Sequence, residues 1–244
     1  MLTQYRFTLR CDAPSQPRSE WAYRLYAALL EQAPPGFGDA VHRNAVTPLS
    51  QFLTVDKYGT PTWTVNLLGN DSERALSGTL DRLRQLKLER GLDLSVQECC
   101  RAEMKDVDAL FALAKRSCGI HRLVFRTATT FKSQGRYQNL PTTRLVLQSL
   151  MKKWNGSIVD CPIDDEDGNG LNALAAGLRC RSFELHDRLF YLKGNSIPGF
   201  IGTLTIENCM QCFHRLLADA LLLFSGYAGI GIKTTLGMGG VEHL

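Results

Sequence analysis

The chain has 244 residues, of which 44% are hydrophobic, 21% charged and 9% aromatic. These are the proportions of a globular protein with a hydrophobic core, and they exclude disordered, collagenous and membrane-embedded classes. The net charge is only +4 over the whole chain, but residues 119–160 hold seven basic groups and one acidic group, a local sum of +6.

That basic segment also contains the aromatic residues Phe125, Phe131, Tyr137 and Trp154. Cations bind phosphates and aromatic rings stack on unpaired bases, so the combination is typical of a nucleic-acid surface. A solvated basic face without a ligand is the alternative that the charge pattern leaves open.

The longest apolar run, residues 216–224, is about half the length that a membrane-spanning helix needs. The first residues lack the apolar region and cleavage site of a secretory signal. We therefore expect a cytoplasmic protein without a membrane partner, in which the eight cysteines remain thiols.

The first 105 residues predict the order β-α-β-β-α-β from their hydrophobic spacing. Apolar residues alternate in the strands, and in the helices they recur every three or four residues. Ser19 is the expected N-cap of the first helix, and Asp71 or Ser72 that of the second, whose apolar stripe is Leu76, Leu80, Leu83 and Leu86. The expected elements are strand 2–11, helix 19–32, a hairpin at 49–69, a helix from residue 71 or 72 to 86, and strand 93–104.

The second half repeats this order after a short helical connector at residues 106–117. Its expected elements are strand 121–131, helix 142–154, hairpin strands 181–193 and 198–207, helix 209–225 and a short last strand. The sequence thus predicts an α+β protein made of two tandem ferredoxin-like domains, 1–118 and 119–244, of the kind found in RNA-recognition modules.

The strongest local motif is GYAGIGIKTTLGMGG near the end of the chain. Glycines permit positive φ angles and close backbone approach, so such a loop can turn its amides toward phosphate oxygens. The loop follows a predicted helix and precedes a strand, which fits neither a Walker loop nor a dinucleotide-binding fingerprint. A flexible glycine tail is the alternative.

Four segments together resemble the CRISPR-associated precursor-RNA processing endoribonucleases of the RAMP superfamily, in particular the version that accompanies type III-A systems. These segments are VHRNAVTPLSQF, FRTATTFKSQGRY, PGFIGTLT and GIGIKTTLGMGG. The resemblance implies two ferredoxin-like domains and cleavage of CRISPR repeat RNA, single-stranded or in a weak hairpin, without metal or cofactor. The family motif usually has proline where this chain has Ala128.

The resemblance also implies the site residues. The family's chemistry is attack of a 2′-hydroxyl on the adjacent phosphate, which leaves a 2′,3′-cyclic phosphate and a 5′-hydroxyl. His42 matches the family's histidine after the first helix, and Tyr26 matches its tyrosine within that helix. Histidine suits both proton transfers because its unperturbed pKa lies near neutrality. The expected RNA-binding residues are Arg43, Lys132, Arg136, Arg144, Gly229, Gly231, Lys233, Thr234, Thr235, Gly237 and Gly239.

Some family members have a lysine a few residues past this histidine, whereas the corresponding stretch here, RNAVTPLS, has none. Arg43, Lys132 or Lys233 would then stabilise charge in its place, or no residue would do so and turnover would be slow. The missing lysine keeps open a repeat-RNA-binding protein with weak or no cleavage. A RAMP subunit of an effector complex is a second alternative, because such subunits share the RAMP fold and the glycine loop. Transient contact with a type III effector complex and homodimer formation are further partner hypotheses.

The remaining histidines and cysteines carry weaker signals. His121, His186, His214 and His243 are expected to be structural or solvated. CMQCFH has the ligand types of a zinc half-site, but a structural zinc site needs four ligands, and no second pair has suitable spacing. No metal site is predicted.

Overall fold

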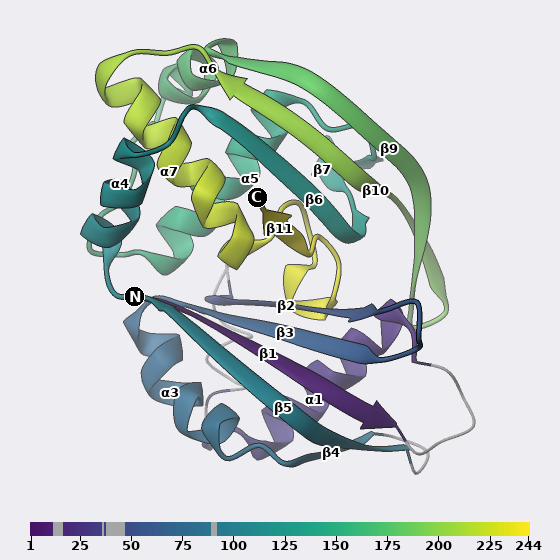
Figure 1. Cartoon of the computed structure of the whole chain (residues 1–244). Helices are drawn as coiled ribbons and strands as arrows, with labels where there is room; N and C mark the ends of the chain where they lie inside the picture. Colours follow the sequence, from purple (N-terminus) through teal and green to yellow (C-terminus); the bar gives the residue numbers. More distant parts are fainter. Residues whose placement is uncertain (12–16, 36, 38–46, 89–91) are drawn as a thin grey trace.

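Two antiparallel sheets, one from each half of the chain, form the framework of the computed structural model (Figure 1). The structure describes residues 1–11, 17–35, 37, 47–88 and 92–244. The predicted α+β class is confirmed. No helix among these residues is long and apolar enough to cross a membrane.

The N-terminal half builds a five-stranded sheet in the order β2-β3-β1-β5-β4. The central strand β1 pairs with β3 on one side and β5 on the other, and alternate side chains along β1 are buried. The elements are β1 (Leu2–Cys11), the short 3-10 helix η1 (Ser19–Trp21), α1 (Ala22–Gln32), β2 (Leu49–Val55), β3 (Pro61–Leu68), α3 (Asn70–Asp81), β4 (Gln85–Leu88) and β5 (Leu92–Met104).

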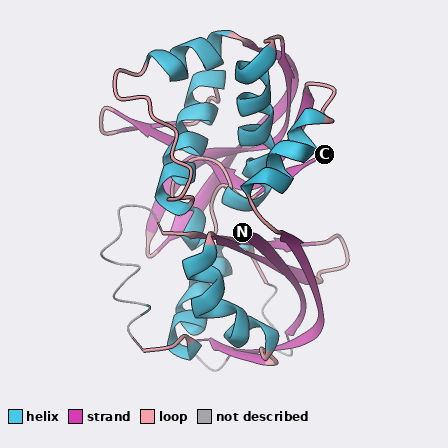
Figure 2. Cartoon of the chain, turned by 90° about the vertical axis from the view of Figure 1, so that its left-hand side faces the viewer, coloured by secondary structure: helices cyan, strands magenta, loops and turns pink. Residues whose placement is uncertain are grey.

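The C-terminal half builds a four-stranded sheet in the order β11-β6-β10-β9. Figure 2 shows the helices of the C-terminal half in front of its strands. The last of these helices, residues 212–228, packs on this sheet and also contacts β1, β2 and β3 of the N-terminal sheet. The helix α4 (Val107–Lys115) connects the two halves. The elements of the C-terminal half are β6 (Ile120–Thr129), β7 (Phe131–Ser133), β8 (Arg136–Gln138), α5 (Thr143–Ser157), α6 (Asn169–Ala176), β9 (Leu178–Leu192), β10 (Asn195–Asn208), α7 (Cys212–Ala228), the 3-10 helix η2 (Thr234–Leu236) and β11 (Val241–His243).

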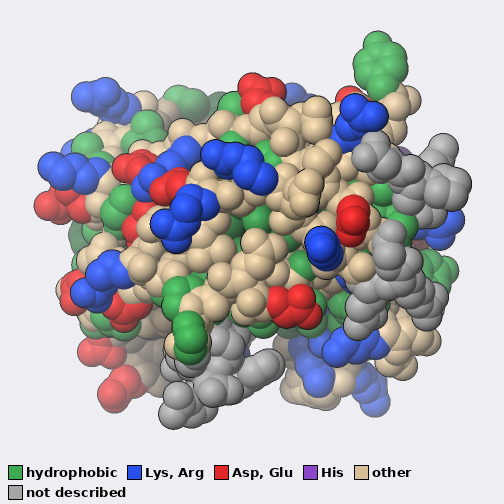
Figure 3. Space-filling model, turned by 90° about the horizontal axis from the view of Figure 1, so that it is seen from below, with side chains coloured by type: hydrophobic (Ala, Val, Ile, Leu, Met, Phe, Trp, Pro, Cys, Tyr) green, Lys and Arg blue, Asp and Glu red, His purple; other side chains and the backbone are tan. Residues whose placement is uncertain are grey.

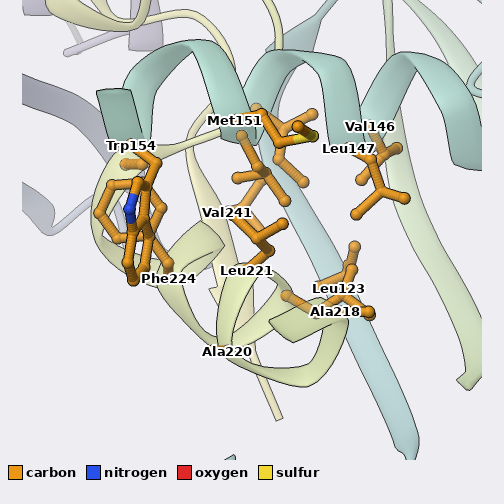
Figure 4. Packing of buried hydrophobic residues seen from close by; sticks show 14 of the residues in the cluster. Leu123, Val146, Leu147, Met151, Trp154, Ala218, Ala220, Leu221, Phe224 and Val241 are labelled. Carbon is orange, nitrogen blue, oxygen red and sulfur yellow. The ribbon is translucent and has the colours of Figure 1, made fainter. Parts of the chain in front are cut away.

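The largest core lies where α5 and α7 pack on each other and on β6 (Figure 4). Trp154 of α5 meets Phe224 of α7 edge to face, with ring centroids 5.3 Å apart. Leu2 and Leu68 of the N-terminal half belong to the same cluster. The core therefore continues across the junction, and this continuity holds the two halves together.

Three details of the sequence prediction are wrong. Ser19 does not cap α1, which follows η1 without a side-chain cap at Trp21. α3 begins after Gly69, not after Asp71 or Ser72, and ends at Asp81. Leu86 is buried as predicted, but it lies on β4, because a strand begins at Gln85 where the leucine spacing suggested a continuing helix.

Candidate functional site

A pocket of about 390 Å³ opens between the two halves. Its ionisable lining groups, among the residues that the structure describes, are all lysines: Lys132, Lys152, Lys153 and Lys233. On the N-terminal half, in contrast, basic and acidic side chains are interspersed over the face seen from below (Figure 3). We call this cavity the basic pocket; its charge suits an anionic ligand such as a phosphate.

One wall of the basic pocket is the glycine-rich loop, residues 229–240. Lys233 has φ 57° and begins the 3-10 turn η2, whose Thr234 and Thr235 also line the pocket. Gly231 has φ +83°, and a Cβ there would overlap the carbonyl oxygen of Thr130. Glycine is therefore needed here both for its backbone angle and for close packing.

The loop is not a flexible tail. The amides of Gly229, Gly231 and Gly239 donate to Ser225 O, Ser149 Oγ and Ala128 O at 2.8–3.0 Å. These three amides are used inside the protein and are not free to bind phosphate. Their glycines serve to pack the backbone, and this packing sets the position of Lys233.

Lys153 lies at the base of this loop. It is only 9% exposed, and its Nζ donates to the carbonyl oxygens of Ala228 at 3.2 Å and Gly229 at 3.0 Å. These carbonyls end α7, where a helix presents unpaired acceptors and partial negative charge. Burial lowers the pKa of Lys153 to about 7.

The basic pocket brings together five of the residues predicted to bind RNA: Lys132, Gly231, Lys233, Thr234 and Thr235. The remaining two cations that the structure describes lie elsewhere on the C-terminal half. Arg136 is exposed on the β7–β8 hairpin. Arg144 is exposed on α5, where its Nε donates to Asn172 Oδ1 at 3.0 Å.

Of the two predicted catalytic residues, Tyr26 lies in the described part of the chain and His42 does not. His42 lies outside the described residues, as does Arg43, while Thr47, shortly after them in sequence, lines the basic pocket. Tyr26 is 8% exposed and belongs to the core of the N-terminal half, away from the pocket lining. Burial raises the pKa of Tyr26 to about 12, so its hydroxyl stays protonated at neutral pH.

A chain of polar contacts joins two of the other histidines near the start of β6. The Nε2 of His121 is 2.8 Å from Asp219 Oδ1, and its Nδ1 is 2.8 Å from His243 Nε2. His121 is 1% exposed, which agrees with the structural role expected for it. Within the described part of the chain, no three His, Cys, Asp or Glu side chains cluster as metal ligands would.

A curated relative from Streptococcus thermophilus, described as "CRISPR-associated endoribonuclease Cas6", is 30% identical to this chain over 235 residues. The match covers 96% of this chain and 94% of the relative. The chain belongs to the Cas6 family of CRISPR-associated endoribonucleases. A Mycobacterium tuberculosis Cas6 is 29% identical over 250 residues, which cover 99% of this chain and 78% of that relative. The sequence model of the Cas6 family matches residues 123–241.

Solved Cas6 structures share the fold over the whole chain. A structure described as a Cas6 product complex has a TM-score of 0.78 at 20% identity, covering 100% of this chain and 99% of that one. Thermus thermophilus Cas6 has a TM-score of 0.72 at 21% identity, with coverages of 100% and 98%. At this identity the likeness concerns the Cas6 fold alone.

Sequence reasoning missed the contribution of α5 to the pocket. Lys152 and Lys153 belong to the basic segment 119–160, but no sequence motif assigns them a role. Lys153 shares the buried stripe of α5 with Val146, Leu147, Leu150, Trp154 and Ser157. A lysine at a core position of an amphipathic helix was the signal that could have distinguished Lys153 from its exposed neighbour Lys152.

Proposed function

We propose that this Cas6 endoribonuclease cleaves the repeat RNA of CRISPR precursor transcripts, and that the RNA backbone binds in the basic pocket. The observation that carries the proposal is the set of four lysines between the halves, with no carboxylate among the described lining residues. Such a site attracts phosphates and stabilises negative charge that develops on them. Two of the similar structures are described as Cas6 complexes with a product and with a substrate mimic.

The proposed reaction is an intramolecular transesterification that needs no metal. A base removes the proton of the 2′-hydroxyl, the 2′-oxygen bonds to the adjacent phosphorus, and the bond from phosphorus to the 5′-oxygen breaks. An acid then protonates the leaving 5′-oxygen, which gives a 2′,3′-cyclic phosphate and a 5′-hydroxyl. Lysine ammonium groups beside the phosphate would stabilise the charge of the transition state.

His42 is the proposed general acid-base residue. It precedes Thr47 of the basic pocket by five residues, a distance of at most about 18 Å in a fully extended chain. One of the similar Cas6 structures is of a variant in which a histidine is replaced by alanine. Tyr26 stays a proposed second catalytic residue, although it belongs to the core of the N-terminal half and does not line the described pocket. It would act as a hydrogen-bond donor, because burial raises the pKa of its hydroxyl to about 12 and disfavours a role as base.

The proposal also includes the domain boundaries and the association with type III-A systems. The strand orders β2-β3-β1-β5 and β11-β6-β10-β9 support two ferredoxin-like domains, 1–118 and 119–244, since both halves run β-α-β-β-α-β with the first and third strands adjacent. The association with type III-A systems rests on the resemblance carried by the segments VHRNAVTPLSQF, FRTATTFKSQGRY, PGFIGTLT and GIGIKTTLGMGG together.

The test is cleavage of the host's repeat RNA by the full chain in EDTA, followed by analysis of the product ends. We expect cyclic-phosphate and 5′-hydroxyl ends, and no cut when the 2′-hydroxyl at the scissile nucleotide is replaced by hydrogen. A cut that survives this substitution would exclude the 2′-hydroxyl as nucleophile. Tight repeat binding without any cut would favour the binding-protein alternative raised by the missing lysine after His42.

A further inference from the structure

The amine of Lys153 has one donor more than the fold uses. A lysine ammonium carries three N–H donors. Two of them donate to Ala228 O and Gly229 O, and no third acceptor is present among the described residues. Lys153 also lines the basic pocket, so a ligand that enters the pocket comes next to this residue.

The described charged groups in the pocket around Lys153 are all positive. The charged side chains that line the same pocket are Lys132 on β7, Lys152 on α5 and Lys233 before η2, and the described lining contains no Asp or Glu. Among the described residues, a protonated Lys153 therefore has no counter-charge in the pocket and is stabilised by the two carbonyl dipoles. The burial that lowers its pKa to about 7 makes a substantial fraction of this amine neutral at physiological pH.

An anion in the pocket would favour the protonated form of Lys153. A phosphate oxygen next to the amine favours the charged form, because opposite charges attract strongly where water is excluded. If Lys153 served only to hold the end of α7, its protonation state would not need to change on RNA binding, because a neutral amine can also donate hydrogen bonds to both carbonyls.

We propose that Lys153 is a phosphate-binding residue of the basic pocket and that it takes up a proton when an RNA phosphate enters. The inference rests on the proposed function, because it assumes that repeat RNA occupies this pocket. The balance is simple: the neutral amine gains one proton from solvent, and the resulting ammonium donates its third N–H to an anionic phosphate oxygen. No bond in the RNA is made or broken in this step.

The experiment measures proton uptake during binding of a repeat RNA that carries a 2′-deoxy group at the scissile nucleotide, so that no cleavage interferes. Titration calorimetry at pH 8 in two buffers of different ionisation enthalpy gives the number of protons bound per RNA. We expect wild-type protein to take up close to one proton. Lysines of ordinary pKa are already charged at this pH and contribute little.

Lys153→Met removes the amine while it keeps a side chain of similar length, and this variant should lose most of the uptake. Lys152→Met is the matched control, since it removes an exposed lysine from the next position of the same helix. The control should bind RNA more weakly and still take up the proton. Uptake that persists in Lys153→Met would place the titrating group elsewhere and overturn the inference.

A second measurement uses only wild-type protein and so decides the question even if Lys153→Met does not fold. Linkage requires the Kd to rise by up to about tenfold per pH unit above the pKa of the free amine. A Kd that is constant between pH 7.5 and 9 would overturn the inference and leave the proposed function intact. Failure of wild-type protein to bind or cut the repeat RNA would instead overturn the proposed function.

Discussion

Gln51 of β2 donates a hydrogen bond from Nε2 to the carbonyl oxygen of Thr235 at 2.8 Å, and this bond joins the N-terminal half to the glycine-rich loop. The same Nε2 donates to Ala22 O at 2.9 Å, while Oε1 accepts from Trp63 Nε1 at 2.7 Å. Gln51 is 1% exposed. Its amide therefore anchors one wall of the basic pocket on the N-terminal sheet.

Gln51→Leu should destabilise the fold and weaken RNA binding together. The substitution leaves a buried indole N–H and two carbonyls without their partner, which costs about 1–3 kcal/mol in the free energy of unfolding. Urea unfolding measures this loss, and Gln97→Leu on β5, an exposed position, is the control. An unfolding midpoint equal to wild type would show that the contact does not anchor the loop.

Neutralising a lysine of the basic pocket should reduce the salt dependence of repeat-RNA affinity. Lys132→Met or Lys233→Met should each lower the slope of log affinity against log salt by roughly 0.7, the value for one lost contact to a single strand. Arg136→Met tests the neighbouring hairpin in the same assay. Lys87→Met on the exposed side of β4 is the control and should leave the slope unchanged. Unchanged slopes in all three variants would place the RNA on another face.

A comparison of Gly231 with Gly194 separates the effect of close packing on stability from the effect of backbone conformation. Both have a φ near +80°, but a Cβ on Gly231 would overlap Thr130 O, whereas a Cβ on Gly194 meets open space. Gly194→Ala should cost about 1–2 kcal/mol through its backbone angle alone and should leave RNA affinity unchanged. Gly231→Ala, and more so Gly231→Val, should lower stability further and weaken RNA binding. Equal behaviour of the two alanine variants would contradict this account.

His243 should make the protein less stable in acid. Burial and the neighbouring His121 lower the pKa of His243 to about 4, against an ordinary value of 6.5, so the unfolded chain binds more protons between these pH values. Stability is thus fully present above about pH 6.5 and falls as pH decreases toward 4, by at most about 3 kcal/mol from this group.

This acid effect is measured as the change in the free energy of unfolding between pH 7 and pH 4.5, compared among wild type and two variants. His243→Gln should show a smaller decrease than wild type, because its side chain does not titrate. His186→Gln on the exposed strand β9 should behave as wild type. The same decrease in all three proteins would assign the effect to other groups, such as the carboxylates.

The order of elements could be predicted because apolar periodicity is strong in this chain. The stripes of α1, α5 and α7 and the alternation of β1 identified both repeats of β-α-β-β-α-β. The end of α3 could not be predicted from the spacing of apolar residues. Leu80, Leu83 and Leu86 follow one helical spacing, but α3 ends at Asp81 and β4 starts at Gln85. The alternation of polar and apolar residues in Gln85–Leu88 is the strand signal, but it overlaps the helical leucine spacing.

The candidate site was predictable only in part. Charge clustering and the glycine motif identified Lys132 and Lys233, but the pocket also needs Lys152, Lys153 and Thr47 from other segments. Their proximity depends on how the two halves pack, which local patterns do not encode. The glycines illustrate the same limit, since composition suggested free amides for phosphate while the fold uses three of these amides internally.

The most direct test of the central claim, histidine-dependent cleavage of RNA held in the basic pocket, is the single-turnover rate of His42→Ala in EDTA. The account predicts a rate lower than wild type by roughly two to four orders of magnitude, the range for general acid-base catalysis. Repeat affinity, measured alongside, should stay within about threefold, because His42 is proposed to transfer protons while the lysines of the pocket bind the phosphates. A wild-type cleavage rate in His42→Ala would contradict the account and place the active site elsewhere.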